Sequence, residues 1–81
     1  MSTELREVIE MRQRVRLDTM TDIKGFVDVV SRVDDMVFLE DNTGFKVSAK
    51  SILGAVLSME WNEVYCCCNK DIAGSIFPWI V

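Results

Sequence analysis

An alternation of polar and hydrophobic residues marks the first structured element of the chain. Residues 12–17 read Arg-Gln-Arg-Val-Arg-Leu. A period of two places Gln13, Val15 and Leu17 on one face of a strand and the three arginines on the other. We therefore expect a half-buried strand whose arginines form a solvated outer face and pair with acidic neighbours. A binding patch is the alternative use for these arginines.

The hydrophobic period then changes from that of a strand to that of a helix. Apolar residues at spacings of three and four are Ile23, Phe26, Val27, Val30 and Val33. Thr21 is the expected N-cap of this helix, and Asp22 suits its positive start. Because valine has a low helix propensity, tertiary packing must stabilise the helix.

Two strands, 36–39 and 45–49, are predicted on either side of the sequence Asp-Asn-Thr-Gly at residues 41–44. This sequence is typical of a hairpin turn. The inward-facing residues are expected to be Val37, Leu39, Val47 and Ala49. Met36 and Phe38 then fall on the outer face, which is unusually apolar for an exposed surface.

The second half of the chain repeats the change from helix to strand. Ser51 is the expected N-cap of an apolar helix over residues 52–59. The last predicted strand, 63–68, follows this helix. Its inward-facing residues are expected to be Val64, Cys66 and Cys68.

A final helix is predicted over residues 70–77. Asn69 is its expected N-cap, and Pro78 should end it because proline lacks the N–H that a helix interior needs. The element order is therefore β-α-β-β-α-β-α. This order predicts an α+β fold, an open-faced sandwich in which helices cover one face of a four-stranded antiparallel sheet.

Length and composition fit one small domain. The chain has 81 residues, 49% of them hydrophobic, and one proline, as expected of a globular protein rather than a disordered one. We expect residues 12–81 to form the domain and residues 1–11 an N-terminal extension. The helical spacing of Leu5, Val8 and Ile9 leaves two alternatives for the extension, a short helix or a disordered tail.

Charge and hydropathy limit the kinds of partner and the cellular compartment that we expect for this chain. The net charge of −4 argues weakly against nucleic acid as a partner, because binding to its backbone needs a basic face. No stretch approaches the roughly 20 apolar residues of a membrane helix, and the polar, acidic residues 1–10 do not resemble a signal peptide. We expect a cytoplasmic protein that binds other proteins, with no membrane contact and no cofactor.

The three cysteines, Cys66, Cys67 and Cys68, are adjacent. Metal sites usually draw their ligands from spaced pairs, and the chain has no second cysteine cluster and no histidine. Neighbouring residues of a strand point to opposite faces, so these thiols are badly placed to bridge one another. We interpret them as reduced, small apolar strand residues, which fits the cytoplasm. A redox or metal role is the alternative.

Residues 49–54 read Ala-Lys-Ser-Ile-Leu-Gly. This segment resembles the Lys-Ser-Ile-Met-Gly segment around the regulatory serine of the HPr family, the small phosphocarriers of the bacterial sugar phosphotransferase system. Residues 30–40 resemble the end of the family's first helix and its second strand through Val-Ser-Arg-Val-Asp and Val-Phe-Leu-Glu. The spacing from Ser51 to residues 63–65 is also nearly that of the family. The resemblance covers about residues 12–77 and implies the HPr-like fold.

The same resemblance identifies what this chain lacks. HPr proteins carry a phosphoryl group on a histidine before the first helix, with an arginine close by. Counted back from Ser31, these two positions fall near Thr19 and Thr21, and the chain contains no histidine. A threonine hydroxyl cannot replace imidazole, which is nucleophilic while neutral near pH 7. Phosphocarrier activity through histidine is therefore excluded, and we expect no catalytic residue and no enzymatic activity.

Ser51 aligns with the serine that a dedicated kinase phosphorylates in some HPr proteins. It is the candidate regulatory phosphosite, although capping its helix would also explain a serine at this position. In the family, apolar residues after this serine form the surface that docks partners. The resemblance implies that their counterparts here are Ile52, Leu53 and Val56.

The resemblance favours a non-catalytic regulatory protein that is switched at Ser51. HPr kinase, a transcriptional regulator or phosphotransferase enzymes would be its partners. The alternative is an accessory protein of the phosphotransferase system that competes with HPr for those partners. A third hypothesis, an unrelated enzyme that uses the cysteines, lacks any base or acid at a readable spacing. The apolar end of the chain, Trp79, Ile80 and Val81, either closes the core or packs against a second copy in a homodimer.

Overall fold

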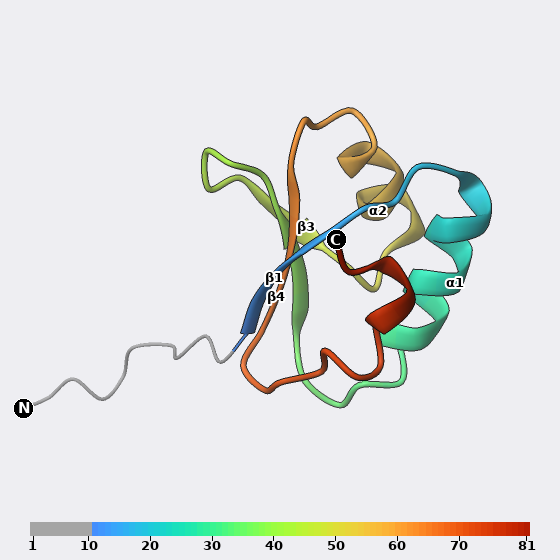
Figure 1. The fold of residues 1–81 in the computed structure, drawn as a ribbon, viewed down its shortest axis with the longest axis vertical. Coiled ribbons are helices and arrows are strands. Elements are labelled where there is room, and N and C mark those ends of the chain that lie inside the picture. The colour runs from blue at the N-terminus through green and yellow to red at the C-terminus, as the bar shows by residue number, and fades with distance from the viewer. Residues whose placement is uncertain (1–10) are drawn as a thin grey trace, which may run out of the picture.

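Four strands form one antiparallel sheet in the order β1-β4-β2-β3 (Figure 1). The computed structural model describes residues 11–81. The strands are β1 (Met11–Val15), β2 (Val37–Glu40), β3 (Lys46–Ser48) and β4 (Val64–Cys68). Strands β2 and β3 form the predicted hairpin, and β4 inserts between β1 and β2. Strand β4 therefore connects β1 to the β2–β3 hairpin.

Two helices, α1 (Met20–Val30) and α2 (Ile52–Ser58), lie on the same side of the sheet (Figure 1). The core fills the space between this layer and the sheet. Its fully buried large side chains include Ile23, Phe26, Val30, Val37, Leu39 and Ile76. The chain is therefore an α+β protein, and its arrangement is compatible with an open-faced sandwich.

The predicted inward faces of the central strands are confirmed. Val37 and Leu39 in β2 are buried, and so are the three inward-facing residues of β4, Val64, Cys66 and Cys68. In β1, Val15 is buried while Gln13 is only half-buried. This difference fits a strand at the edge of the sheet, where fewer neighbours cover each residue.

The N-cap of helix α1 lies two residues before the predicted cap at Thr21. Thr19 is the N-cap, because its hydroxyl accepts a hydrogen bond from the Asp22 N–H at 3.1 Å. The Asp22 carboxylate in turn accepts from the Thr19 N–H at 3.2 Å, which completes a capping box. A cap at Thr21 would have put Lys24 at the matching position, and lysine has no acceptor for the backbone.

The predicted final helix over residues 70–77 is wrong. Residues 73–75 form a turn, and a short 3-10 helix spans Phe77–Trp79. Gly74 lowers the helix propensity in the middle of this stretch, and too few residues precede Pro78 to propagate a helix. The Asp71 carboxylate instead accepts from the Ala73 N–H at 2.9 Å, which favours a turn. Ile72 and Ile76 are both buried, and the Ile76 N–H donates to the Ile72 carbonyl at 3.2 Å within this single turn.

The last residues of the chain close the core and cover part of the free edge of β1. The Trp79 ring meets Phe26 edge-on, with ring centroids 5.5 Å apart. The Trp79 carbonyl accepts from the Arg16 N–H at 2.8 Å, and Ile80 forms a bridge with Val15. Trp79 and Ile80 therefore close the core, which was the first of the two alternatives for the end of the chain. Val81 stays 55% exposed.

The predicted N-terminal extension lies almost wholly outside the described residues. The described structure begins at Met11, which is already part of β1, so the strand starts one residue before the predicted boundary. The alternatives for Leu5, Val8 and Ile9 fall in residues 1–10. Within residues 11–81, neither helix has the length and the apolar character needed to cross a bilayer.

Candidate docking surface

The start of α2 is built around Ser51, as the sequence predicted. Ser51 is the N-cap, and its hydroxyl accepts a hydrogen bond from the Gly54 N–H at 3.2 Å. This contact satisfies one of the backbone donors that a helix start leaves free. No acidic residue lies in the first turn of α2. The cap is therefore a single hydrogen bond, in contrast to the reciprocal pair at α1.

The other residues of the segment 49–54 also have structural roles. Ala49 is fully buried, and its N–H donates to the Val37 carbonyl at 2.9 Å. A Cβ atom on Gly54 would lie 2.8 Å from the carbonyl oxygen of Ser48, so only glycine lets α2 approach β3 this closely. Lys50 donates from Nζ to the Val33 carbonyl at 2.6 Å. Packing alone thus accounts for several residues that carry the HPr resemblance.

Three apolar side chains of α2 point away from the core. Leu53 is 81% exposed, Leu57 46% and Ile52 42%; we call these three residues the α2 surface. Val56, which was predicted to dock partners, is only partly exposed because it packs against the core. Two of the three predicted docking residues therefore lie on an exposed surface, and Val56 contributes mainly to packing.

Sequence reasoning missed three apolar residues on or beyond α2. Leu57 belongs to the α2 surface itself. Phe45, 53% exposed, meets Trp61 edge-on with ring centroids 5.9 Å apart. Leu53, Leu57 and Trp61 follow one another at intervals of four, whereas the buried residues of α2 are Ala55 and Ser58. That spacing of large residues opposite small ones was the signal that could have found them.

The position near which HPr proteins carry histidine is occupied by the cap of α1. The Thr19 hydroxyl already accepts from Asp22 N–H. The Asp22 carboxylate also accepts from the Asp18 N–H at 3.1 Å, so two acidic residues flank Thr19. A second negative charge, such as a phosphoryl group, would be repelled here. Thr21 lies inside the helix and is exposed.

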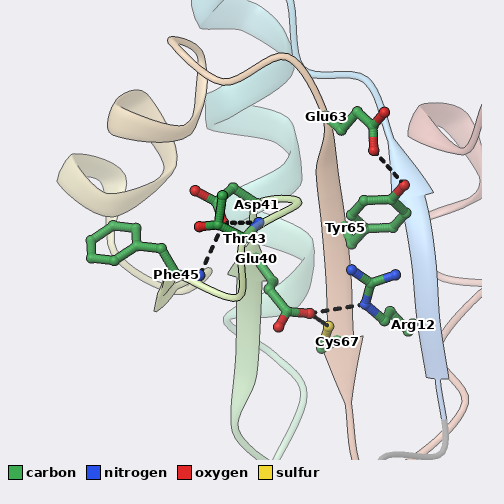
Figure 2. Close-up of polar contacts among 8 residues, drawn as sticks. All are labelled: Arg12, Glu40, Asp41, Thr43, Phe45, Glu63, Tyr65 and Cys67. Carbon is green, nitrogen blue, oxygen red and sulfur yellow. Dashed lines mark hydrogen bonds and ion pairs between the residues drawn. The ribbon is translucent and has the colours of Figure 1, made fainter.

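The face of the sheet that carries no helix is crossed by a polar network (Figure 2). The Arg12 Nε donates to Glu40 Oε1 at 2.9 Å, and the Arg12 guanidinium lies 3.8 Å from the centre of the Tyr65 ring. The Cys67 thiol donates to the same Glu40 oxygen at 3.4 Å. The network joins β1, β4 and β2. It confirms the predicted acidic pairing for Arg12, and Arg16 lies 3.9 Å from Asp18.

The environment of Cys66 and Cys67 makes these two thiols poor nucleophiles. Burial raises the pKa of Cys66 to about 12. Burial, reinforced by the hydrogen bond to Glu40, raises the pKa of Cys67 to about 11. Both thiols are therefore protonated at neutral pH, and a protonated thiol neither attacks an electrophile nor binds a metal well. All three cysteines are free, and within residues 11–81 no group of three acidic or cysteine side chains is placed to hold a metal ion.

Comparison with known proteins adds no relative. No family model matches the chain, and no curated protein or solved structure matches it either. The likeness to HPr proteins therefore rests on the residues quoted above.

Proposed function

We propose that this chain is a non-catalytic regulatory protein of the HPr type, which docks on protein partners through the α2 surface and is switched by phosphorylation at Ser51. The observation that carries the proposal is the exposure of Ile52, Leu53 and Leu57 on one short helix. The partners would be HPr kinase, a transcriptional regulator or enzymes of the phosphotransferase system, in the cytoplasm.

The energetics of apolar burial support docking at this surface. Fully burying a leucine or isoleucine side chain is favourable by about 1.5–3 kcal/mol. Folding buries only part of the Ile52 and Leu57 side chains and very little of Leu53, which is 81% exposed. Most of this favourable free energy is therefore not gained in the free chain. A partner that covers all three side chains would recover the rest. Exposed residues clustered in this way mark interaction sites more often than scattered ones do.

The local charges support Ser51 rather than Thr19 as the phosphorylated residue. Thr19 lies between Asp18 and Asp22, whose carboxylates would repel a phosphoryl group. The first turn of α2 contains no acidic residue, and Lys50 precedes Ser51. A phosphoryl group on Ser51 would also sit at the border of the α2 surface, where it would change the charge that a docked partner meets.

Phosphorylation by HPr kinase and ATP, followed by intact mass, tests the switch. The kinase would transfer the γ-phosphoryl group to Ser51 Oγ and release ADP. We expect the addition of one phosphate to the unaltered chain and none to Ser51→Ala. Ser75→Ala is the matched control, because Ser75 is an exposed serine outside α2 and its loss should leave the reaction unchanged. No addition, while a true HPr is phosphorylated in parallel, would contradict regulation by this kinase.

The alternative function, competition with HPr for its partners, would use the same surface. Adding the unaltered chain to a mixture of HPr, HPr kinase and ATP should then slow phosphorylation of HPr. Leu53→Lys should abolish the inhibition, because it places a charge on the most exposed residue of the α2 surface. Phosphorylation of the chain itself without any inhibition of HPr at excess concentration would leave the regulatory function and contradict the competitor.

A further inference from the structure

The Lys50 side chain links the start of α2 to the segment that follows α1. Its ammonium donates to the Val33 carbonyl at 2.6 Å, a contact between residues 17 positions apart that is partly buried. Val33 follows the end of α1 by three residues, and Lys50 immediately precedes the cap of α2. Within residues 11–81, no carboxylate forms a salt bridge with Lys50. The Lys50 ammonium is therefore held by the Val33 carbonyl, through a charge-assisted hydrogen bond.

The opposite side of the α2 start rests on Ser48 of β3. The position of a Gly54 Cβ would lie 2.8 Å from the Ser48 carbonyl oxygen, so the helix backbone lies directly against the strand. The Lys50 N–H donates to the Ser48 hydroxyl at 3.2 Å. Ser48 thus holds the sheet side of the α2 start through both its carbonyl and its hydroxyl oxygen. On the α1 side, the hydrogen bond at its start comes from the lysine side chain.

A helix as short as α2 depends on such contacts for its orientation. It has seven residues, and helices of this length are unstable without tertiary support. Ile52 is the residue directly after the cap, and Leu53 follows it. Any rotation of the first turn would therefore move two residues of the α2 surface.

We propose that the contact between Lys50 and Val33 is a latch, which holds the first turn of α2 and its exposed residues in one orientation. Loss of the ammonium charge releases this turn and leaves the sheet folded. The link from the latch to partner docking rests on the proposed function. The latch itself concerns the free chain and needs neither a partner nor a kinase.

Amide hydrogen exchange of the free chain tests the latch through Lys50→Met, which keeps the length of the side chain and removes its charge. We expect the amides of residues 54–58 to exchange at least about tenfold faster, the loss expected for one charge-assisted hydrogen bond. The amides of β2 and β4 should be unchanged. Lys46→Met is the matched control, since Lys46 is an exposed lysine of β3 and should leave α2 protected.

A second measurement keeps the test decisive if Lys50→Met fails to fold. In the unaltered chain, the ammonium protons of Lys50 should exchange with water more slowly than those of Lys46, as seen by nitrogen-15 NMR. Lys50→Arg, which keeps a charged donor, should retain most of the protection of α2. Equal ammonium exchange at the two lysines, or unchanged α2 protection in Lys50→Met, would overturn the latch. Neither result would bear on phosphorylation at Ser51, so the two proposals fail independently.

Discussion

The open face of the sheet and the α2 surface differ in how far their apolar side chains are exposed. The open face of the sheet has no helix over it, yet Cys67 at its centre is only 3% exposed. The α2 surface belongs to the helical layer, yet Leu53 is 81% exposed. Whether helices cover a face therefore does not determine whether its apolar side chains are exposed to water.

The difference lies in the long charged side chains available to each surface. On the open face, Arg12 lies over Tyr65, and the Lys46 Nζ lies 5.6 Å from the centre of the Phe38 ring. Such side chains cover apolar groups with their methylenes and keep their charges in water. Helix α2 contains no lysine or arginine that could do this. Cys67 on the open face is thus covered by the protein's own side chains, whereas Ile52, Leu53 and Leu57 of the α2 surface stay exposed.

The largest expected effect comes from separating α2 from the sheet. Gly54→Ala places a Cβ atom 2.8 Å from the Ser48 carbonyl oxygen, a backbone atom that cannot move away cheaply. We expect a loss of about 1–3 kcal/mol in the free energy of unfolding, measured by urea denaturation. Gly74→Ala is the control, because no atom lies within 4 Å of its Cβ position. If both variants are equally stable, close contact does not fix α2 on β3.

A smaller effect is expected from uncovering the open face. Arg12→Ala removes the guanidinium over Tyr65 and one hydrogen bond to Glu40. Because Arg12 is half-exposed, the loss of stability should be about 1 kcal/mol or less. Cys67 should react faster with a thiol reagent in the folded variant. Arg14→Ala serves as control, since none of the salt bridges among residues 11–81 involves Arg14. Unchanged reactivity of Cys67 would mean that Arg12 does not cover it.

The open face should also contribute an acid-sensitive part of the stability. The hydrogen bond from Arg12 is the main cause that lowers the pKa of Glu40 below its usual 4.5. A carboxyl whose pKa is lower in the folded chain stabilises the fold above its unfolded pKa, and this contribution disappears as the pH falls through the folded pKa. Denaturation between pH 7 and pH 3 should therefore show a smaller loss for Glu40→Gln than for the unaltered chain. Parallel curves for the two proteins would contradict this assignment.

The smallest effect on stability is expected on the α2 surface. Leu53→Ser should change the free energy of unfolding by less than about 0.5 kcal/mol, because Leu53 makes little contact with the core. The same change should reduce retention on a hydrophobic column at neutral pH. Lys24→Ser, at an exposed position of α1, should leave retention unchanged. A marked loss of stability in Leu53→Ser would show that this leucine is structural.

The sequence predicted well where local chemistry decides the outcome. The period of two correctly assigned the buried faces of β2 and β4, and Ser51 was correctly identified as a cap. The larger error falls where a distant contact decides. The end of the chain was predicted as a helix, but its path is set by pairing with β1 and by the contact of Trp79 with Phe26. The cap of α1 is a local error, because Asp22 forms its reciprocal hydrogen bonds with Thr19 and not with Thr21.

The candidate site shows the same division between local and distant causes. Of the three candidate docking residues, Ile52 and Leu53 are exposed, but Val56 packs against the core and Leu57 takes its place on the surface. A helical period identifies which residues share a face. It does not tell which of two adjacent apolar faces the neighbouring elements will cover.

By itself, the sequence determined that this chain cannot carry a phosphoryl group on histidine, because it contains none. It also determined the faces of the central strands, because side-chain direction follows from the backbone period. Only the tertiary structure decided that Cys67 is buried beneath Arg12 and Glu40 while Leu53 stays in water. Exposure depends on which long side chains reach across from other strands, and strand order and register bring those residues together only after the chain has folded.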